Sequence, residues 1–246
     1  MLTFLGYTLV FLALLVSLYL VIRPEASSRS FLRTAAMGAQ SSPFLLLSLS
    51  FIFEATSLDL VSSYVGEGLP LFYRISAVWG SRSGPLLMWA SMMSVIAWLM
   101  SKDETTDSTT IRVLHFWTLL LLLISAGLRP FSPAVPGSAG EISPLLQTDL
   151  MVIHPPVVFV YYSLCLATAS VAVSGLIRSR PSNEIHASMI PWARYSFLAG
   201  TIGIGLGGLW AYTVLDWGGY WAWDPVETGS LCLLYTSDAA DELSCV

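Results

Sequence analysis

LTFLGYTLVFLALLVSLYLVI, residues 2–22, is an uncharged and almost wholly apolar run close to the start of the sequence. A helix needs about 20 such residues to cross the hydrocarbon core of a bilayer. The run has no basic segment before it and no small-residue cleavage site after it, as a signal peptide would. We therefore expect it to be a membrane-spanning helix.

The remainder of the 246 residues has the same character, with 55% hydrophobic and 11% charged residues. A soluble domain carries about 25% charged residues, and a chain of this length could not bury so much apolar surface in water. Acidic residues outnumber basic ones by 16 to 11, which argues against a nucleic-acid-binding surface. Three cysteines without a CxxC pair argue against a zinc ribbon and a disulfide scaffold.

The apolar stretches predict an all-α, polytopic membrane helix bundle with about six transmembrane helices. Glycines in the last stretch, between 200 and 208, would permit close contact between helices. A seventh helix is expected to begin near Pro225. In chain order, the six predicted spans are 2–22, 43–61, 84–100, 113–128, 155–177 and 195–215.

Basic residues predict the orientation, because cytoplasmic loops carry more Lys and Arg than external ones. An external N-terminus places eight of the eleven basic residues inside and leaves Arg74, Arg82 and Arg129 outside. The external loops, 62–83, 129–153 and 216 onward, are long and rich in aromatic residues, Gly and Pro. Loops held by a rigid scaffold often carry function, so we expect the functional face to be external.

The densest aromatic segment is WGGYWAW, residues 217–223. On a helix, Trp217, Tyr220 and Trp221 would share one face, and Gly218 and Gly219 would let a flat ligand approach the backbone. A porphyrin fits such a shelf best and a quinone head second. The alternative is an aromatic belt at the membrane interface, although Trp223 makes the segment denser than such belts usually are.

The acidic residues that follow, in Asp224-Pro225-Val226-Glu227, match the start of a helix better than an acid–base pair. Asp224 would be the N-cap, Pro225 the first helical residue, and Glu227 the third residue of a capping box.

His154 is expected at the external mouth of the fifth helix, immediately before Pro155 and Pro156. A single histidine in a membrane protein is often a satisfied polar residue, but neutral imidazole is also a common axial ligand of haem iron. We expect His115 to lie at the internal interface and His186 in a solvated loop. Each external arginine could equally anchor a lipid headgroup or pair with haem propionates, and Arg74 is the preferred candidate for the propionates.

WGGYWAWDPVETGSL, residues 217–231, resembles the tryptophan-rich WWD signature of haem-handling proteins in cytochrome c maturation, and within them the CcmF/NrfE haem lyase family. Stretches 69–89, 142–162 and 206–221 agree in order and spacing, although residues 81–85 depart from the family pattern. The resemblance covers nearly all of residues 1–231.

This resemblance implies that a b-type haem in transit binds on the outer face, with His154 as axial ligand of the iron. The protein would present that haem for thioether attachment to apocytochrome c, as a haem lyase component in the prokaryotic cytoplasmic or mitochondrial inner membrane. Its implied partners are a CcmE-like haem chaperone, apocytochrome c and other maturation subunits. The implied haem-binding residues are His154, Trp217, Gly218, Gly219, Tyr220, Trp221, Trp223, Asp224 and Arg74.

Other functions remain open at this point. A CcmC-like haem transporter would carry haem without ligating it to a protein. A quinone-binding respiratory subunit would be expected to place paired Lys and Glu residues deep within helices, and only Glu54 comes close. A structural assembly subunit is a third alternative.

Residues 232–246 change character abruptly, since three acids follow an apolar run. Cys232–Glu242 resembles a translated sequencing-library adapter, so we expect 232–246 to be a non-native tail. We expect residues 1–231 to form a single membrane domain, the first part of a longer protein, with the haem-handling segment at 216–231.

Overall fold

The computed structural model describes residues 1–66, 68–103, 105–135, 137, 139–214 and 219–242, the last six by their backbone alone. They form two compact units, one from Met1 to Thr148 and one from Asp149 onward. The prediction of one membrane domain over 1–231 is not tested by this division. Each unit is described by itself.

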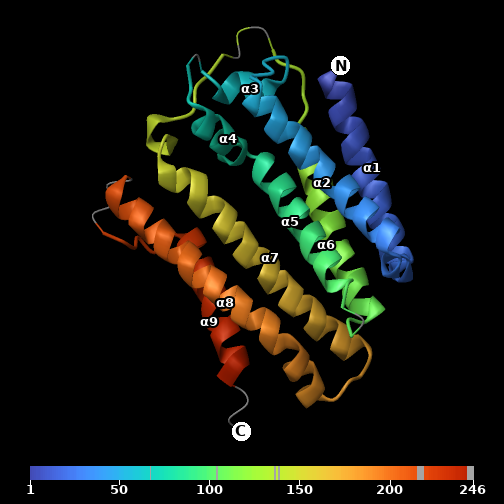
Figure 1. Ribbon diagram of the computed structural model, residues 1–246. Coiled ribbons are helices and arrows are strands. Elements are labelled where there is room, and N and C mark those ends of the chain that lie inside the picture. The colour runs from blue at the N-terminus through green and yellow to red at the C-terminus, as the bar shows by residue number, and fades with distance from the viewer. Residues whose placement is uncertain (67, 104, 136, 138, 215–218, 243–246) are drawn as a thin grey trace. The chain divides into compact units, whose positions relative to one another are not determined.

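In the first unit, four long helices pack side by side (Figure 1). Neighbours in this ring are α1 with α2, α2 with α5, α5 with α6, and α6 with α1. The helices are α1 (Leu2–Ile22), α2 (Ser30–Ile52), α5 (Gly84–Met100) and α6 (Ser108–Gly127). Shorter helices lie in the connections, namely η1 (Pro24–Ser28), α3 (Asp59–Tyr64) and α4 (Leu71–Gly80), and η2 (Pro144–Leu146) follows α6.

The interior of this unit combines large apolar side chains, such as Phe51, with many small residues, whereas other large apolar side chains such as Phe4 and Phe11 are exposed. Small residues let membrane helices approach closely, and lipid covers the outer apolar side chains. Buried small residues include Ala13, Ser17, Ala90, Ser94, Ala97, Thr118 and Ser125.

His115 lies in this interior and not at the interface, which corrects the prediction from sequence. Its side chain is only 4% exposed, and its Nδ1 lies 3.1 Å from Nε2 of Gln40. The same Gln40 nitrogen donates to Oγ of Ser17 at 2.9 Å. A single apolar helix gives no sign of its polar partner on another helix, so this network was not predictable.

The second unit contains α7 (Asp149–Ile177), α8 (Ser182–Thr213) and α9 (Pro225–Glu242). α7 and α8 run side by side along their length, and α9 packs against α8 (Figure 1). α9 continues through Leu231, so the proposed non-native tail shares a helix with the residues before it.

Among the described residues, four helices are long and apolar enough to cross a membrane, or five if α4 and α5 count as one broken span. The four are α1, α2, α6 and α7; α4 and α5 meet at an angle of 91°. The predicted sixth span, 195–215, lies mostly within α8. α8 is not among the four helices that meet this criterion.

Several predicted boundaries were wrong, chiefly because proline was taken as a helix start. Pro43 lies within α2, and Pro155 and Pro156 lie within α7, which begins at Asp149. Membrane helices tolerate internal proline better than soluble ones do. The predicted external loop 62–83 also contains a helix, α4.

Candidate functional site

His154 lies in the second turn of α7, where its side chain reaches the backbone of α8. Its Nδ1 is 3.0 Å from the carbonyl oxygen of Gly203. Because a carbonyl only accepts, Nδ1 must carry the proton of this hydrogen bond. In the neutral imidazole the lone pair is then on Nε2, and this is the tautomer that a metal-binding histidine with a backbone partner adopts.

Glycines of α8 make this contact possible. A Cβ atom on Gly207 would lie 2.8 Å from Cε1 of His154, which is closer than two carbon atoms can approach. A Cβ on Gly203 would lie 3.2 Å from Val158, and one on Gly200 would lie 2.7 Å from Tyr161. These three residues form a glycine stripe that confirms the predicted close helix contact; Gly205 takes no part in it.

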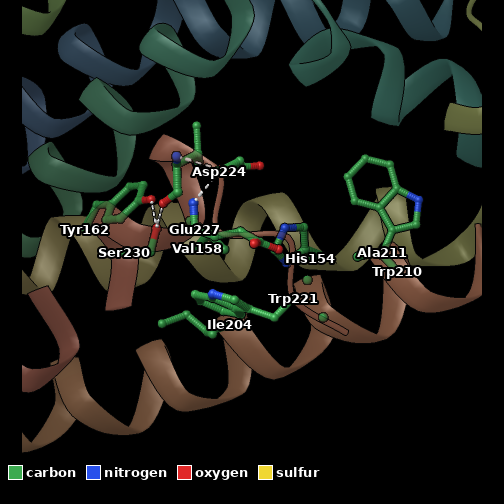
Figure 2. A pocket seen from close by; sticks show the side chains of 13 residues that line it. His154, Val158, Tyr162, Ile204, Trp210, Ala211, Trp221, Asp224, Glu227 and Ser230 are labelled. Atoms are coloured by element: carbon green, nitrogen blue, oxygen red, sulfur yellow. Dashed lines mark hydrogen bonds between the residues drawn. The ribbon is translucent and has the colours of Figure 1, made fainter. Parts of the chain in front are cut away.

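A cavity of about 170 Å³ opens beside His154. In Figure 2, Tyr162, Glu227 and Ser230 gather at one end, and Trp210 lies at the other end, beyond His154. All of its lining belongs to the second unit: His154, Val158, Tyr162, Ile204, Gly207, Gly208, Trp210, Ala211, Trp221, Asp224, Val226, Glu227 and Ser230.

Two indole N–H groups are available at this cavity. Nε1 of Trp210 and Nε1 of Trp221 are buried and have no hydrogen-bond partner among the described residues. The ring of Trp210 lies 5.9 Å from that of His154, between centroids. A buried donor without a partner costs free energy, so a ligand that brings an acceptor oxygen to such a group would be favoured. In Figure 2 the indole nitrogen of Trp210 lies on the side of the ring away from His154.

The aromatic segment does not form the predicted shelf on one helix face, because Gly219–Trp223 is not helical. Tyr220 is 57% exposed and stacks on Tyr212 at 4.3 Å. Trp223 is 71% exposed and has a positive φ of 59°. Of these described aromatics only Trp221 lines the cavity. Trp217 and Gly218 lie outside the described residues, and Gly219 does not line the cavity.

The predicted capping of α9 is confirmed. Oδ1 of Asp224 accepts hydrogen bonds from the backbone N–H groups of Val226 and Glu227, at 2.7 and 2.8 Å. The Glu227 carboxylate reaches further back than in a standard capping box, to the N–H of Ala222 at 2.9 Å. Both carboxylates line the cavity. Their hydrogen bonds are structural, because they fix the backbone beside Trp221.

Two tyrosines of α7, which the sequence analysis did not single out, hold α9 in place. The hydroxyl of Tyr161 donates to the carbonyl oxygen of Ser230 at 2.9 Å, and Tyr162 is hydrogen-bonded to Oγ of the same residue. His154, Val158 and Tyr162 follow one another at intervals of four residues and therefore lie on the same face of α7. That spacing of four residues was the signal that could have found it.

Arg74 belongs to the first unit, where its guanidinium forms an ion pair with Glu54. Nη1 lies 2.7 Å from the Glu54 carboxylate and donates to the carbonyl oxygen of Ile52 at 3.0 Å. These contacts anchor Arg74 within its own unit, and its role toward haem propionates stays a prediction.

Comparison with known proteins gives consistent results. The family described as cytochrome c assembly protein matches residues 79–239. Cytochrome c-type biogenesis protein NrfE of Haemophilus influenzae is 32% identical over 76% of this chain and 31% of its own length. CcmF of Escherichia coli K12 is 32% identical over 85% of this chain and 33% of its own length. The chain thus spans about a third of these relatives.

A solved structure, described as the cytochrome c haem lyase CcmF, has a similar fold. The TM-score is 0.77 at 22% sequence identity, covering 100% of this chain and 43% of that one. At this identity the similarity is evidence for the fold alone.

Proposed function

Since the chain belongs to the cytochrome c assembly protein family, and within it to the CcmF/NrfE type, we propose that it handles haem during cytochrome c biogenesis. The haem is the substrate, a b-type haem in transit that is bound at the cavity beside His154. The observation that carries this proposal is the hydrogen bond from His154 to Gly203, since it directs the proton to Nδ1 and leaves Nε2 able to bind iron.

The cavity suits one edge of a haem rather than the whole ring. Pockets that enclose a ligand of drug size measure about 300–1,000 Å³, and this one measures about 170 Å³. The indole N–H of Trp221, which has no protein partner among the described residues, would donate to a propionate carboxylate at a haem edge. The rest of the ring would lie against exposed aromatic residues such as Trp223.

Haem supplies the chemistry, because its vinyl groups form thioethers with the reduced cysteine thiols of an apocytochrome c. The part of this chain is to hold the iron, fix the ring orientation and keep the vinyl edge accessible. Holding two reactants in place raises their effective concentration. No nucleophile or general base of this chain is needed. Partners of this step would be a CcmE-like chaperone, apocytochrome c and other maturation subunits.

The proposed location is a prokaryotic cytoplasmic or mitochondrial inner membrane with an external N-terminus. If α4 and α5 form one broken span, the five candidate spans would be joined by α8 as the sixth, because its 32 residues exceed the thickness of a bilayer. The cavity would then face the external side, where c-type cytochromes are assembled.

The test is haem content and holocytochrome c yield with full-length wild-type protein and its His154→Ala variant. We expect His154→Ala to lose most haem and most holocytochrome c, whereas His186→Ala, the same change elsewhere in this unit, retains both. Unchanged haem in His154→Ala would refute the ligand role. Haem loss with undiminished holocytochrome c yield would refute the role in attachment and favour a haem carrier.

A further inference from the structure

A second cavity, of about 490 Å³, lies in the first unit between η1, the start of α2 and the α5–α6 connection. Figure 1 shows the α1–α2 and α5–α6 connections at the same end of this unit. Three of the four helices that end or begin there are candidate membrane spans, namely α1, α2 and α6. In a membrane the cavity would therefore lie where these apolar helices meet the polar headgroup layer.

Residues of positive and of negative charge line this cavity. Among the described residues, Arg33 and Lys102 are its cations, and Glu25 and Asp103 are its carboxylates. Hydrogen bonds from the backbone and side chain of Thr105 lower the pKa of the Asp103 carboxyl, which keeps it ionised. A simple anion would meet two carboxylates here, and a simple cation would meet two basic groups. The lining matches a ligand that carries both charges.

Two polar atoms in this lining have no partner among the described residues. Oγ of Ser27 is buried, with Ser27 only 2% exposed. Nε of Arg33 is also buried without a partner, although Nη1 of the same guanidinium donates to the carbonyl oxygen of Ser101 at 2.6 Å. The Arg33 contact to Ser101 fixes the guanidinium at the cavity wall. Ser27 and Arg33 together provide two donors for an oxyanion.

Lys102 is held nearby, with Nζ lying 3.2 Å from the centroid of the Trp98 ring. This cation–π contact restrains a side chain that would otherwise be free in solvent. The basic residues of the cavity also belong to the side that the distribution of Lys and Arg marks as cytoplasmic.

We propose that this cavity binds the headgroup of a zwitterionic phospholipid from the cytoplasmic leaflet, with the phosphate on Ser27 and Arg33 and the ammonium group facing Glu25 and Asp103. The acyl chains would pass between the exposed apolar side chains of the neighbouring spans. Such a lipid would fix the two connections against each other at this end of the bundle. This site is independent of the proposed haem site, which lies in the other unit.

The test uses full-length, delipidated protein and native mass spectrometry. Phosphatidylethanolamine, phosphatidylglycerol and inorganic phosphate are added separately. We expect phosphatidylethanolamine to bind. Phosphatidylglycerol, which lacks the ammonium group, should bind more weakly and replace it poorly. Inorganic phosphate at the same concentration should not displace it, because it has no acyl chains. Equal binding of the two lipids, or displacement by phosphate, would overturn the proposal.

Variants localise the site. Ser27→Ala removes a hydroxyl without a protein partner among the described residues and so should not impair folding; we expect about tenfold weaker lipid binding, the value of a charge-assisted hydrogen bond. Arg33→Gln should weaken binding at least as much. The control is Arg180→Gln, an arginine of the second unit that pairs with Glu184, which should bind lipid as wild type does. Wild-type affinity in both Ser27→Ala and Arg33→Gln would overturn the proposal.

Discussion

The imidazole of His154 packs directly against Gly207, and a Cβ atom at residue 207 would lie only 2.8 Å from Cε1 of the imidazole. The ring cannot give way easily, because Nδ1 is bonded to the carbonyl oxygen of Gly203 one turn earlier in α8. The orientation of the proposed iron ligand is thus determined by the backbone of the neighbouring helix.

Gly207→Ala should therefore displace the His154 ring and lower haem affinity by about tenfold or more, through loss of an oriented ligand. The measurement is haem titration of the purified full-length protein, followed by absorbance. Gly205→Ala is the matched control, because a Cβ at Gly205 meets nothing within 4 Å. Equal affinities in the two alanine variants would show that the contact does not orient the histidine.

Substitutions of Asp224 can distinguish whether this carboxylate only caps α9 or also acts on the ligand through its charge. Asp224→Asn keeps an oxygen that caps α9 and should retain haem binding, whereas Asp224→Ala should destabilise the protein by about 1 kcal/mol. Thermal unfolding and haem titration of both variants measure this. If Asp224→Asn loses haem binding while its stability stays at the wild-type value, the negative charge itself acts on the ligand.

Tyr161 joins α7 to α9 through its bond to the carbonyl oxygen of Ser230. Tyr161→Phe removes a buried hydrogen bond and should cost about 1 kcal/mol of stability, with a secondary loss of haem because α9 carries part of the cavity wall. Tyr195→Phe changes an exposed residue of α8 and should have no effect on either quantity. Equal stability of the two variants would contradict the anchoring role.

The network of His115, Gln40 and Ser17 belongs to the first unit and should serve stability alone. His115→Ala leaves the buried Gln40 amide short of a partner, at a cost of about 1–3 kcal/mol. We expect a lower denaturation temperature with unchanged haem stoichiometry per folded protein. A specific loss of haem from folded His115→Ala would instead make His115 part of the haem site.

Sequence alone was sufficient for the existence of most helices, because an uncharged apolar run as long as 2–22 is typical of a membrane span and of little else. It was less informative about their ends, since Pro43 and Pro155 are accommodated inside membrane helices. The cap at Asp224 was predictable because capping depends on local spacing. The shape of Gly219–Trp223 was not, since its path depends on contacts of Tyr220 with Gly208 and Tyr212 of α8.

The central claim, that His154 binds haem iron, is tested most directly by chemical rescue. Full-length wild-type protein and its His154→Gly variant are loaded with haem, and their axial ligands are compared by magnetic circular dichroism. We predict that His154→Gly loses one histidine-ligated haem signal and that added imidazole restores it. A His154→Gly spectrum identical to that of wild type, with no response to imidazole, would contradict the claim.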